Sequence, residues 1–196
     1  MILPIVAYGT PVLKKRAVDV ELDDPDLNAL IANMWETMYA ASGVGLAAPQ
    51  VGLSLRLFVV DASPFAEDDD LEEHERAQLK DFKQVFINPV IEEESGEAWA
   101  FTEGCLSIPD IREDVSRQEH LTIRYTTETG AIKTERYSGL AARVIQHEYD
   151  HIEGVLFTDK LSPLKKRLIK GKLTNISKGK IAVDYKMKFP LQSKKR

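Results

Sequence analysis

Apolar residues recur at helical spacing early in the chain and predict an amphipathic helix. Asp24 is placed to cap this helix, Pro25 suits its first position, and Gly43 is placed to end the run. The apolar positions follow one another at intervals of one, three or four residues, as on one face of a helix. They are Leu27, Leu30, Ile31, Met34 and Met38. This stripe is expected to pack in the core.

The middle of the chain has the apolar patterns of strands. Residues 56–61 form a short apolar run typical of a buried strand, and residues 84–91 indicate another. Residues 121–125 and 132–137 alternate with a period of two on either side of Thr129 and Gly130, which favours a β-hairpin.

Two further helices are expected in the second half of the chain. Ser138 can cap the first of them and Gly154 can end it. Its buried side would consist of Leu140, Val144, Ile145 and Ile152. The second would begin near Ser162 and Pro163 and run to about Ile176. Strands followed by helices, without a strand–helix–strand alternation, favour the α+β class.

Length and composition indicate one globular domain in a reducing compartment. The chain has 196 residues, of which 43% are hydrophobic and 29% charged, as in ordinary globular proteins. Cys105 is the single cysteine, which excludes an internal disulfide framework. The N-terminus lacks a basic leader followed by an apolar run, and no stretch approaches the about 20 apolar residues that cross a bilayer. We therefore expect a cytoplasmic protein without membrane contact.

Charge is distributed unevenly along the chain. Residues 160–196 contain thirteen Lys or Arg and one acidic residue, so they carry +12 and leave −17 on the remainder of a chain with net charge −5. Such a segment predicts an anionic partner, or a tail that folds back on an acidic body. Residues 67–75 are strongly acidic and are interpreted as a solvated insertion with room for a short helix. A bare acidic run supplies no geometry for a cation, and His74 within it is expected to be exposed.

The helix predicted between Ser138 and Gly154 carries His147, Glu148 and His151, the pattern of a helical metal site. Side chains four positions apart share a helix face, so both imidazoles can bind one divalent ion with Glu148 beside its open position. The alternative is a chance spacing on a solvated face. The helix is otherwise apolar, however, and a buried imidazole or carboxylate is costly unless it binds something. We therefore predict a metal site, with Glu148 as an acid/base residue.

The third ligand is expected upstream of this helix. One protease group continues the motif with a histidine where Phe157 stands here, and another uses a downstream glutamate, but none follows Glu153. Cys105, in a glycine-containing segment, is the natural candidate, and His120 is the competitor. Cys105 could instead be a buried thiol or a nucleophile, but a thiolate beside metal-bound imidazoles would ligate first. This set leaves a fourth position for water, as in catalytic sites.

Three segments together resemble the signature motifs of the peptide deformylases. Residues 43–50 are Gly-Val-Gly-Leu-Ala-Ala-Pro-Gln, residues 103–107 are Glu-Gly-Cys-Leu-Ser, and residues 146–151 are Gln-His-Glu-Tyr-Asp-His. Their order and rough spacing also match, and three motifs are far more specific than the helical one alone. The resemblance covers roughly residues 1–170. The segment near 66–76 looks like an insertion, and the last twenty or so residues are not covered.

The resemblance implies a compact single domain in which antiparallel or mixed sheets pack around a central metal-binding helix, with N-terminal and C-terminal helices. Residues 1–178 would form the catalytic domain and residues 179–196 a basic tail. It also implies removal of the formyl group from the formyl-methionine of nascent bacterial or organellar proteins, with Cys105, His147 and His151 as ligands. Fe²⁺ is the usual metal that it implies, with Zn²⁺, Ni²⁺ or Co²⁺ able to occupy the site. The ligand set alone does not select iron.

The expected mechanism follows from these residues. A divalent ion lowers the pKa of its water from about 15.7 toward about 7. The metal-bound hydroxide would attack the formyl carbon, and Glu148 would pass a proton to the leaving amine. The resemblance assigns the oxyanion donors to the Leu106 N–H and the Gln50 side-chain amide, and it groups Gly45 with these catalytic residues.

The resemblance also suggests where the substrate binds. An extended peptide would bond to backbone near Val44 and Gly104, in the manner of an added strand. Val144 and Arg143 match walls of the methionine pocket, and Arg112 matches a position that contacts the substrate or supports this pocket.

Two other functions would need features that this chain does not have. A metallopeptidase that cleaves internal bonds would need a downstream ligand, which the chain lacks. A catalytically idle homologue would be expected to have lost Gln50, Cys105 or Glu148, all of which are present.

The basic segment at 160–196 has two interpretations. It could dock the enzyme on ribosomal RNA phosphates without reading sequence, as some deformylases are thought to do through a C-terminal helix. Alternatively, Leu164, Leu168 and Ile169 could pack a terminal helix on the body, with the lysines solvated or facing the acidic insertion.

Overall fold

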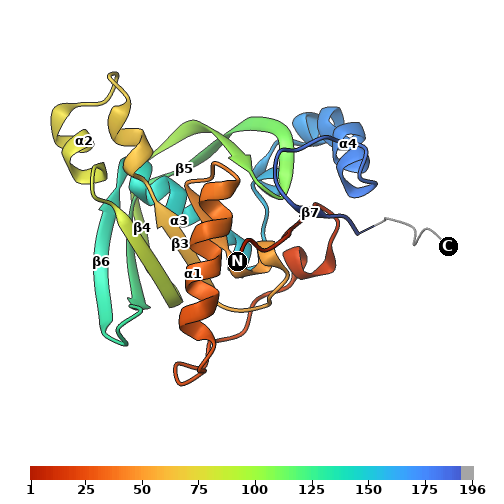
Figure 1. The fold of residues 1–196 in the computed structure, drawn as a ribbon. Helices are drawn as coiled ribbons and strands as arrows, with labels where there is room; N and C mark the ends of the chain where they lie inside the picture. The colour runs from red at the N-terminus through yellow and green to blue at the C-terminus, as the bar shows by residue number, and fades with distance from the viewer. Residues whose placement is uncertain (191–196) are drawn as a thin grey trace.

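The structure is a computed structural model that describes residues 1–190 (Figure 1). Lys194, Lys195 and Arg196 of the predicted basic tail lie outside the described residues. Strands form one main antiparallel sheet and one small parallel pair, and helices pack against them. The architecture is α+β, as predicted.

Five strands form the main sheet in the order β2-β3-β4-β5-β6. They are β2 (Gly45–Ala47), β3 (Leu57–Asp61), β4 (Lys83–Cys105), β5 (Ile108–Thr126) and β6 (Ile132–Ser138). The strand expected at 56–61 and the hairpin around Thr129 and Gly130 are confirmed, with Tyr125 paired with Lys133. The strand expected at 84–91 continues much further, to Cys105, and pairs with β5 along its length.

Two helices pack on opposite faces of the sheet because successive residues of β3 point to opposite sides. Leu57 and Val59 face the cluster that contains α1 (Leu27–Ala40). Phe58 and Val60 face the cluster that contains α3 (Gly139–Ile152). Every residue of β3 is therefore buried, and α3 lies on the sheet as a fixed, desolvated helix.

The first helix begins later than predicted. Asp26 occupies the N-cap position of α1, and no side chain caps it. The Asp24 carboxylate instead accepts the Asp26 N–H at 2.9 Å in a turn that precedes the helix. The prediction that Asp24 caps the helix, with Pro25 as its first residue, is therefore wrong.

The other helices agree with their predicted positions. α2 (Glu73–Leu79) is the short helix of the acidic insertion, and His74 in it is exposed. α3 follows Ser138, and Gly154 after it has a φ of 73°, a left-handed conformation that glycine adopts without strain. α4 (Pro163–Ser177) starts at Ser162, whose hydroxyl accepts the Lys165 N–H at 3.3 Å.

The packing expected for α4 is partly wrong. Leu164 and Leu168 are 65% and 72% exposed, and the buried side consists of Ile169, Leu173 and Ile176. Figure 1 shows α2 and α4 on opposite sides of the molecule, so the basic helix does not face the acidic insertion. Among residues 1–190, no helix is both long enough and apolar enough to span a membrane.

The end of the described chain returns to its beginning. β7 (Met187–Lys188) pairs in parallel with β1 (Ile5–Val6). The Ile5 N–H donates to the Lys186 carbonyl and the Ala7 N–H to the Lys188 carbonyl, both at 2.9 Å. We call residues 180–190 the C-terminal arm. This part of the predicted tail packs against the first strand.

Candidate active site

The three predicted metal ligands converge on one point. Cys105 ends β4, while His147 and His151 lie one turn apart on α3. Their ligand atoms all lie within 4.8 Å of one another. His120, the competing ligand, is not part of this group, which is the one cluster of this kind in the described range 1–190.

The surroundings of Cys105 and His151 fit a divalent metal ion. The Cys105 Sγ lies 3.3 Å from the His151 Nε2. His151 is 1% exposed, and its Nδ1 has no hydrogen-bond partner within residues 1–190. Burial, together with the positive charge of His147, holds the pKa of His151 well below its usual value, so its ring is neutral and can offer a lone pair. One sulfur and two nitrogens suit a transition metal with a fourth position open.

Glu103 orients His147. The His147 Nδ1 donates to the Glu103 carboxylate at 2.9 Å, which leaves Nε2 as the ligand atom. Arg117 donates to both oxygens of the same carboxylate, at 2.6 and 2.9 Å, and Arg143 donates at 3.1 Å. Burial alone would raise the pKa of Glu103, but the bonds from Arg117 and His147 lower it well below its usual value, so it stays ionised.

The same contacts act on the protonation of His147. Burial lowers the pKa of its ring, but the contacts with Cys105 and Glu103 outweigh burial and raise the pKa to about 10. An ion that binds Nε2 must therefore displace a proton, so binding is expected to strengthen as pH rises.

Glu148 is a buried carboxyl with an unpaired oxygen. It is 4% exposed, and its Oε2 has no hydrogen-bond partner in the described part of the chain. Gly45 leaves the room for this side chain, because a Cβ on Gly45 would collide with the Glu148 Oε1. Burial raises the pKa of Glu148 to about 7, although the positive charge of His147 opposes it. Such a group can both accept and release a proton near neutral pH.

Gln50 presents its amide nitrogen to the ligand sulfur. It lies on a short 3₁₀ turn (Ala48–Val51) and is 1% exposed. The Ala47 N–H donates to the Gln50 Oε1 at 2.7 Å, which fixes the orientation of the amide group. Its Nε2 then lies 3.5 Å from the Cys105 Sγ, beside the ligand cluster.

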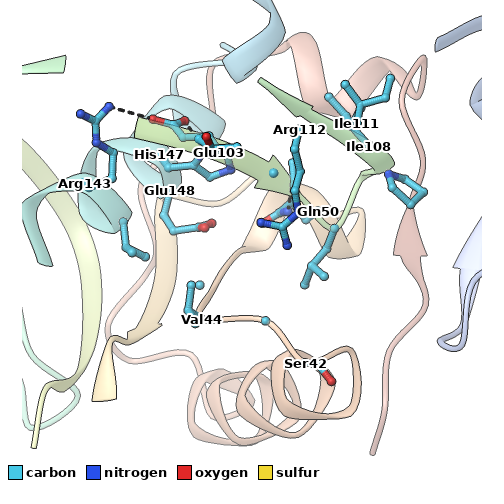
Figure 2. Close-up of a pocket in the computed structure, with 18 of the residues that line it drawn as sticks. Ser42, Val44, Gln50, Glu103, Ile108, Ile111, Arg112, Arg143, His147 and Glu148 are labelled. Atoms are coloured by element: carbon cyan, nitrogen blue, oxygen red, sulfur yellow. Dashed lines mark hydrogen bonds and ion pairs between the residues drawn. The ribbon is translucent and has the colours of Figure 1, made fainter. Parts of the chain in front are cut away.

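A cavity of about 620 Å³ opens beside these side chains (Figure 2). Every predicted site residue except His151, which is buried behind it, lines this cavity. They are Val44, Gly45, Gln50, Gly104, Cys105, Leu106, Arg112, Arg143, Val144, His147 and Glu148. Figure 2 shows Glu148 and Arg112 pointing into the cavity, whereas the Arg143 guanidinium points away, toward Glu103.

Several cavity residues were not found from the sequence. Phe65, directly before the acidic insertion, packs edge-to-face with Phe101 on one wall, with ring centroids 6.5 Å apart. Tyr185 of the C-terminal arm also lines the cavity. Glu103 lay within a recognised motif, but no role was assigned to it. Its signal was a charge directly before the glycine and cysteine of a ligand segment.

An α+β domain whose buried helix presents two imidazoles and a free carboxyl to a cysteine at a cavity is a metal-dependent hydrolase. A profile of the polypeptide deformylase family matches residues 2–167. The peptide deformylase of Christiangramia forsetii is 67% identical over 196 residues and covers 100% of both chains. That of Flavobacterium johnsoniae is 60% identical, also over 196 residues and 100% of both chains.

Solved structures agree with these sequence matches. The crystal structure of a peptide deformylase from Legionella pneumophila has a TM-score of 0.77 and 38% identity, over 92% of this chain and 98% of the other. The chain belongs to the polypeptide deformylase family. Its activity is therefore removal of the N-terminal formyl group from nascent proteins, which confirms the family and the class of enzyme predicted from the motifs.

Proposed function

We propose that deformylation by this chain depends on one divalent ion held by Cys105, His147 and His151, with Fe²⁺ as the native metal. The observation that carries the proposal is the convergence of these three ligand atoms, within 4.8 Å of one another, beside the Glu148 carboxyl, whose Oε2 has no hydrogen-bond partner within residues 1–190. Iron rests on the resemblance of the three motifs, since the same ligands also suit Zn²⁺, Ni²⁺ or Co²⁺.

When bound, such an ion would act as a Lewis acid and lower the pKa of a water molecule at its fourth position. Glu148 then accepts a proton from the attacking water. The water oxygen bonds to the formyl carbon, the C–N bond breaks, and Glu148 returns the proton to the amine nitrogen. The products are formate and a free amino terminus. Because the Glu148 carboxyl is desolvated and its Oε2 has no partner among the described residues, it can serve in both steps.

The carbonyl oxygen of the formyl group gains negative charge during the attack and needs donors. We assign this role to the Gln50 Nε2 and the Leu106 N–H. The Gln50 Nε2 lies 3.5 Å from the Cys105 Sγ, and Leu106 directly follows Cys105 in the chain. Ala47 fixes the Gln50 amide in advance, so little reorganisation is needed when the charge develops.

The cavity accounts for substrate binding. We propose that an extended formyl-methionyl peptide bonds to backbone at Val44, Gly45 and Gly104, with its methionine side chain against Val44 and Val144. Arg143 would support this wall from behind, because its guanidinium is occupied by Glu103 and by the Val115 and Trp99 carbonyls. Arg112, which has no ion pair within residues 1–190, remains available to the peptide.

The decisive experiment is anaerobic purification with metal analysis, followed by measurement of formate released from formyl-Met-Ala-Ser. We expect stoichiometric iron and formate release that is lost when a chelator strips the metal and restored by Fe²⁺. An acetylated peptide of the same sequence is the control, and it should not react. Formate release by the fully metal-free protein would contradict the proposal.

We also propose that α4 docks the enzyme on ribosomes in the cytoplasm, close to nascent chains. The supporting observation is its outer face, where Leu164 and Leu168 are exposed among Lys166, Arg167 and Lys170. The exposed lysine and arginine side chains suit a surface that carries RNA phosphate, and such contacts need no base recognition.

A further inference from the structure

The C-terminal arm has the alternation of a strand that lies on the body. Ile181, Val183, Tyr185, Met187 and Phe189 are partly buried, and the residues between them are exposed. The Ile5 and Ala7 amides bond to this arm, and its inward side chains join the apolar clusters below it. The arm lies beyond residue 167, where the match to the family profile ends.

Tyr185 connects the arm with the active site. Its hydroxyl donates to the Leu106 carbonyl at 2.7 Å, and its side chain lines the catalytic cavity. Leu106 belongs to the turn that joins β4 to β5, directly after the ligand Cys105. The next carbonyl of this turn, that of Ser107, accepts the Tyr8 N–H at 2.8 Å. Segments from both ends of the described chain therefore hold two successive carbonyls of one turn.

We propose that Tyr185 is a positioning residue for deformylation. By holding the Leu106 carbonyl, it keeps the turn in the orientation that points the Leu106 N–H at the developing oxyanion. This inference rests on the proposed role of Leu106. A donor that stabilises charge in the transition state must already be aligned, because any rotation of the turn adds to the barrier.

The chemistry of the contact suits this role. Burial, with the negative charges of Cys105 and Asp110 adding to it, raises the pKa of Tyr185, so the phenol stays protonated and remains a donor. The neighbouring apolar side chain, Met187, seats the arm on the body, so loss of the hydroxyl alone should leave the arm in place.

The test is Tyr185→Phe in the full chain, loaded with metal and assayed on formyl-Met-Ala-Ser. We expect kcat to fall by about tenfold, less than the loss on removing a donor itself. KM should change by less than about twofold, because the contact matters in the transition state. Metal content and melting temperature should stay at wild-type values.

Tyr8→Phe is the matched control. It also removes a phenolic hydroxyl, from a residue whose backbone N–H bonds to the same turn. Within residues 1–190 the Tyr8 hydroxyl makes no hydrogen bond, and the backbone N–H is retained. Its kcat should be unchanged. An unaltered kcat in Tyr185→Phe would overturn the inference, and so would equal losses of kcat in both variants.

Measuring kcat of Gln50→Ala in parallel distinguishes the role of Tyr185 from the proposed oxyanion donors. A large loss in Gln50→Ala with none in Tyr185→Phe rejects the role of Tyr185 and leaves the oxyanion assignment intact. No loss in either variant rejects both. A loss in Tyr185→Phe alone supports the role of the turn and removes Gln50 from the mechanism.

Discussion

Glu103 and Glu148 are two buried carboxyls beside His147 with opposite surroundings. Arg117, Arg143 and His147 surround Glu103 with donors, so it stays ionised and cannot exchange protons near neutral pH. Glu148 has an oxygen without a partner in the described residues and a pKa raised to about 7 by burial. Their environments therefore make Glu103 a structural carboxylate and suit Glu148 to proton transfer.

The first prediction separates catalysis from metal binding. We expect Glu148→Ala to lower formate release by about 10²- to 10⁴-fold, the usual contribution of general acid–base catalysis. Metal content per chain should remain at the wild-type level, because Glu148 does not ligate. Metal analysis beside the formate assay checks both quantities, and loss of metal together with activity would show that the assigned role is wrong.

The second prediction concerns Glu103. Glu103→Gln removes the charge that pairs with two buried arginines and orients His147. We expect the free energy of unfolding to fall by about 3–5 kcal/mol, as for other broken buried ion pairs. Metal affinity should fall by about 10- to 100-fold, as for other residues that orient a ligand. Denaturant unfolding and metal competition measure the two effects.

Glu113→Gln is the control for that variant, because Glu113 of β5 pairs with Glu103 of β4 in the sheet. Glu113 pairs with Lys165 at 2.9 Å near the surface, where solvent screens ion pairs and they add little to stability. Similar stability losses in both variants would mean that the buried network is not what stabilises the site.

At the scale of elements, the site depends on close approach between β2 and α3. β2 passes the helix at Gly45, where there is no room for a side chain beside Glu148. This contact places the backbone proposed to bind the peptide next to the residue proposed to transfer the proton. The glycine is therefore required by packing, even though its own φ is not in the left-handed range.

We accordingly expect Gly45→Ala to lower kcat on formyl-Met-Ala-Ser by at least about tenfold, because the new methyl group displaces the Glu148 carboxyl. The fold should survive, as judged by circular dichroism and metal content. Gly171→Ala in α4 is the control, because a Cβ there meets nothing within 4 Å. It should leave activity unchanged and raise stability by about 0.5–1 kcal/mol. Full activity of Gly45→Ala would contradict the packing argument.

Elements were predictable where local spacing and local chemistry agreed. Residues 138–152 combine a serine at the N-cap position, apolar helical spacing and the metal motif, so both the helix and its ligands could be predicted. The continuation of β4 could not, because Glu92, Glu93 and Glu94 lack an apolar alternation. Its strand conformation depends on pairing with distant β5. The contact between Glu103 and Arg117 follows from the pairing of β4 with β5, so it could not be predicted from the sequence either.

The sequence of the C-terminal arm contains the apolar alternation of a strand, but its basic charge favoured another interpretation. Apolar residues alternate from Ile181 to Phe189, as in a strand, but the thirteen lysines and arginines of residues 160–196 favoured the interpretation of this segment as part of a basic tail. A two-residue alternation that spans charged positions fits a strand with one solvated face. The partner strand, β1, has only two residues and gave no signal of its own.

At the scale of the whole molecule, the acidic and basic surfaces are separated. α2 and α4 lie on opposite sides, so the molecule has one face suited to RNA phosphate and another that would be repelled by it (Figure 1). The catalytic cavity is built from other elements, so docking through α4 need not cover it.

The fourth prediction tests this docking. We expect Lys166→Glu, Arg167→Glu and Lys170→Glu together to abolish co-sedimentation with ribosomes in low salt, while activity on formyl-Met-Ala-Ser remains. Binding of the unaltered chain should weaken steeply with added salt, because each phosphate contact releases counterions. Deletion of residues 179–196 would not serve, since it would remove β7 and Tyr185.

The control carries the same charge change elsewhere. Lys80→Glu, Lys133→Glu and Arg136→Glu alter exposed positions on and near α2 and β6. Ribosome binding by this control should persist. Undetectable binding of the intact chain in low salt would reject the docking proposal.

The pairing of β1 with β7 has a consequence for the order in which the enzyme matures. A ribosome makes residues 1–178 before the arm, so the ligand residues of β4 and α3 are made before Tyr185. Contacts between residues so distant in sequence form slowly, because the chain must first close a long loop. The turn at Leu106 therefore gains its last support late in biogenesis, and a growing copy of this enzyme reaches full activity only after its arm has joined the first strand.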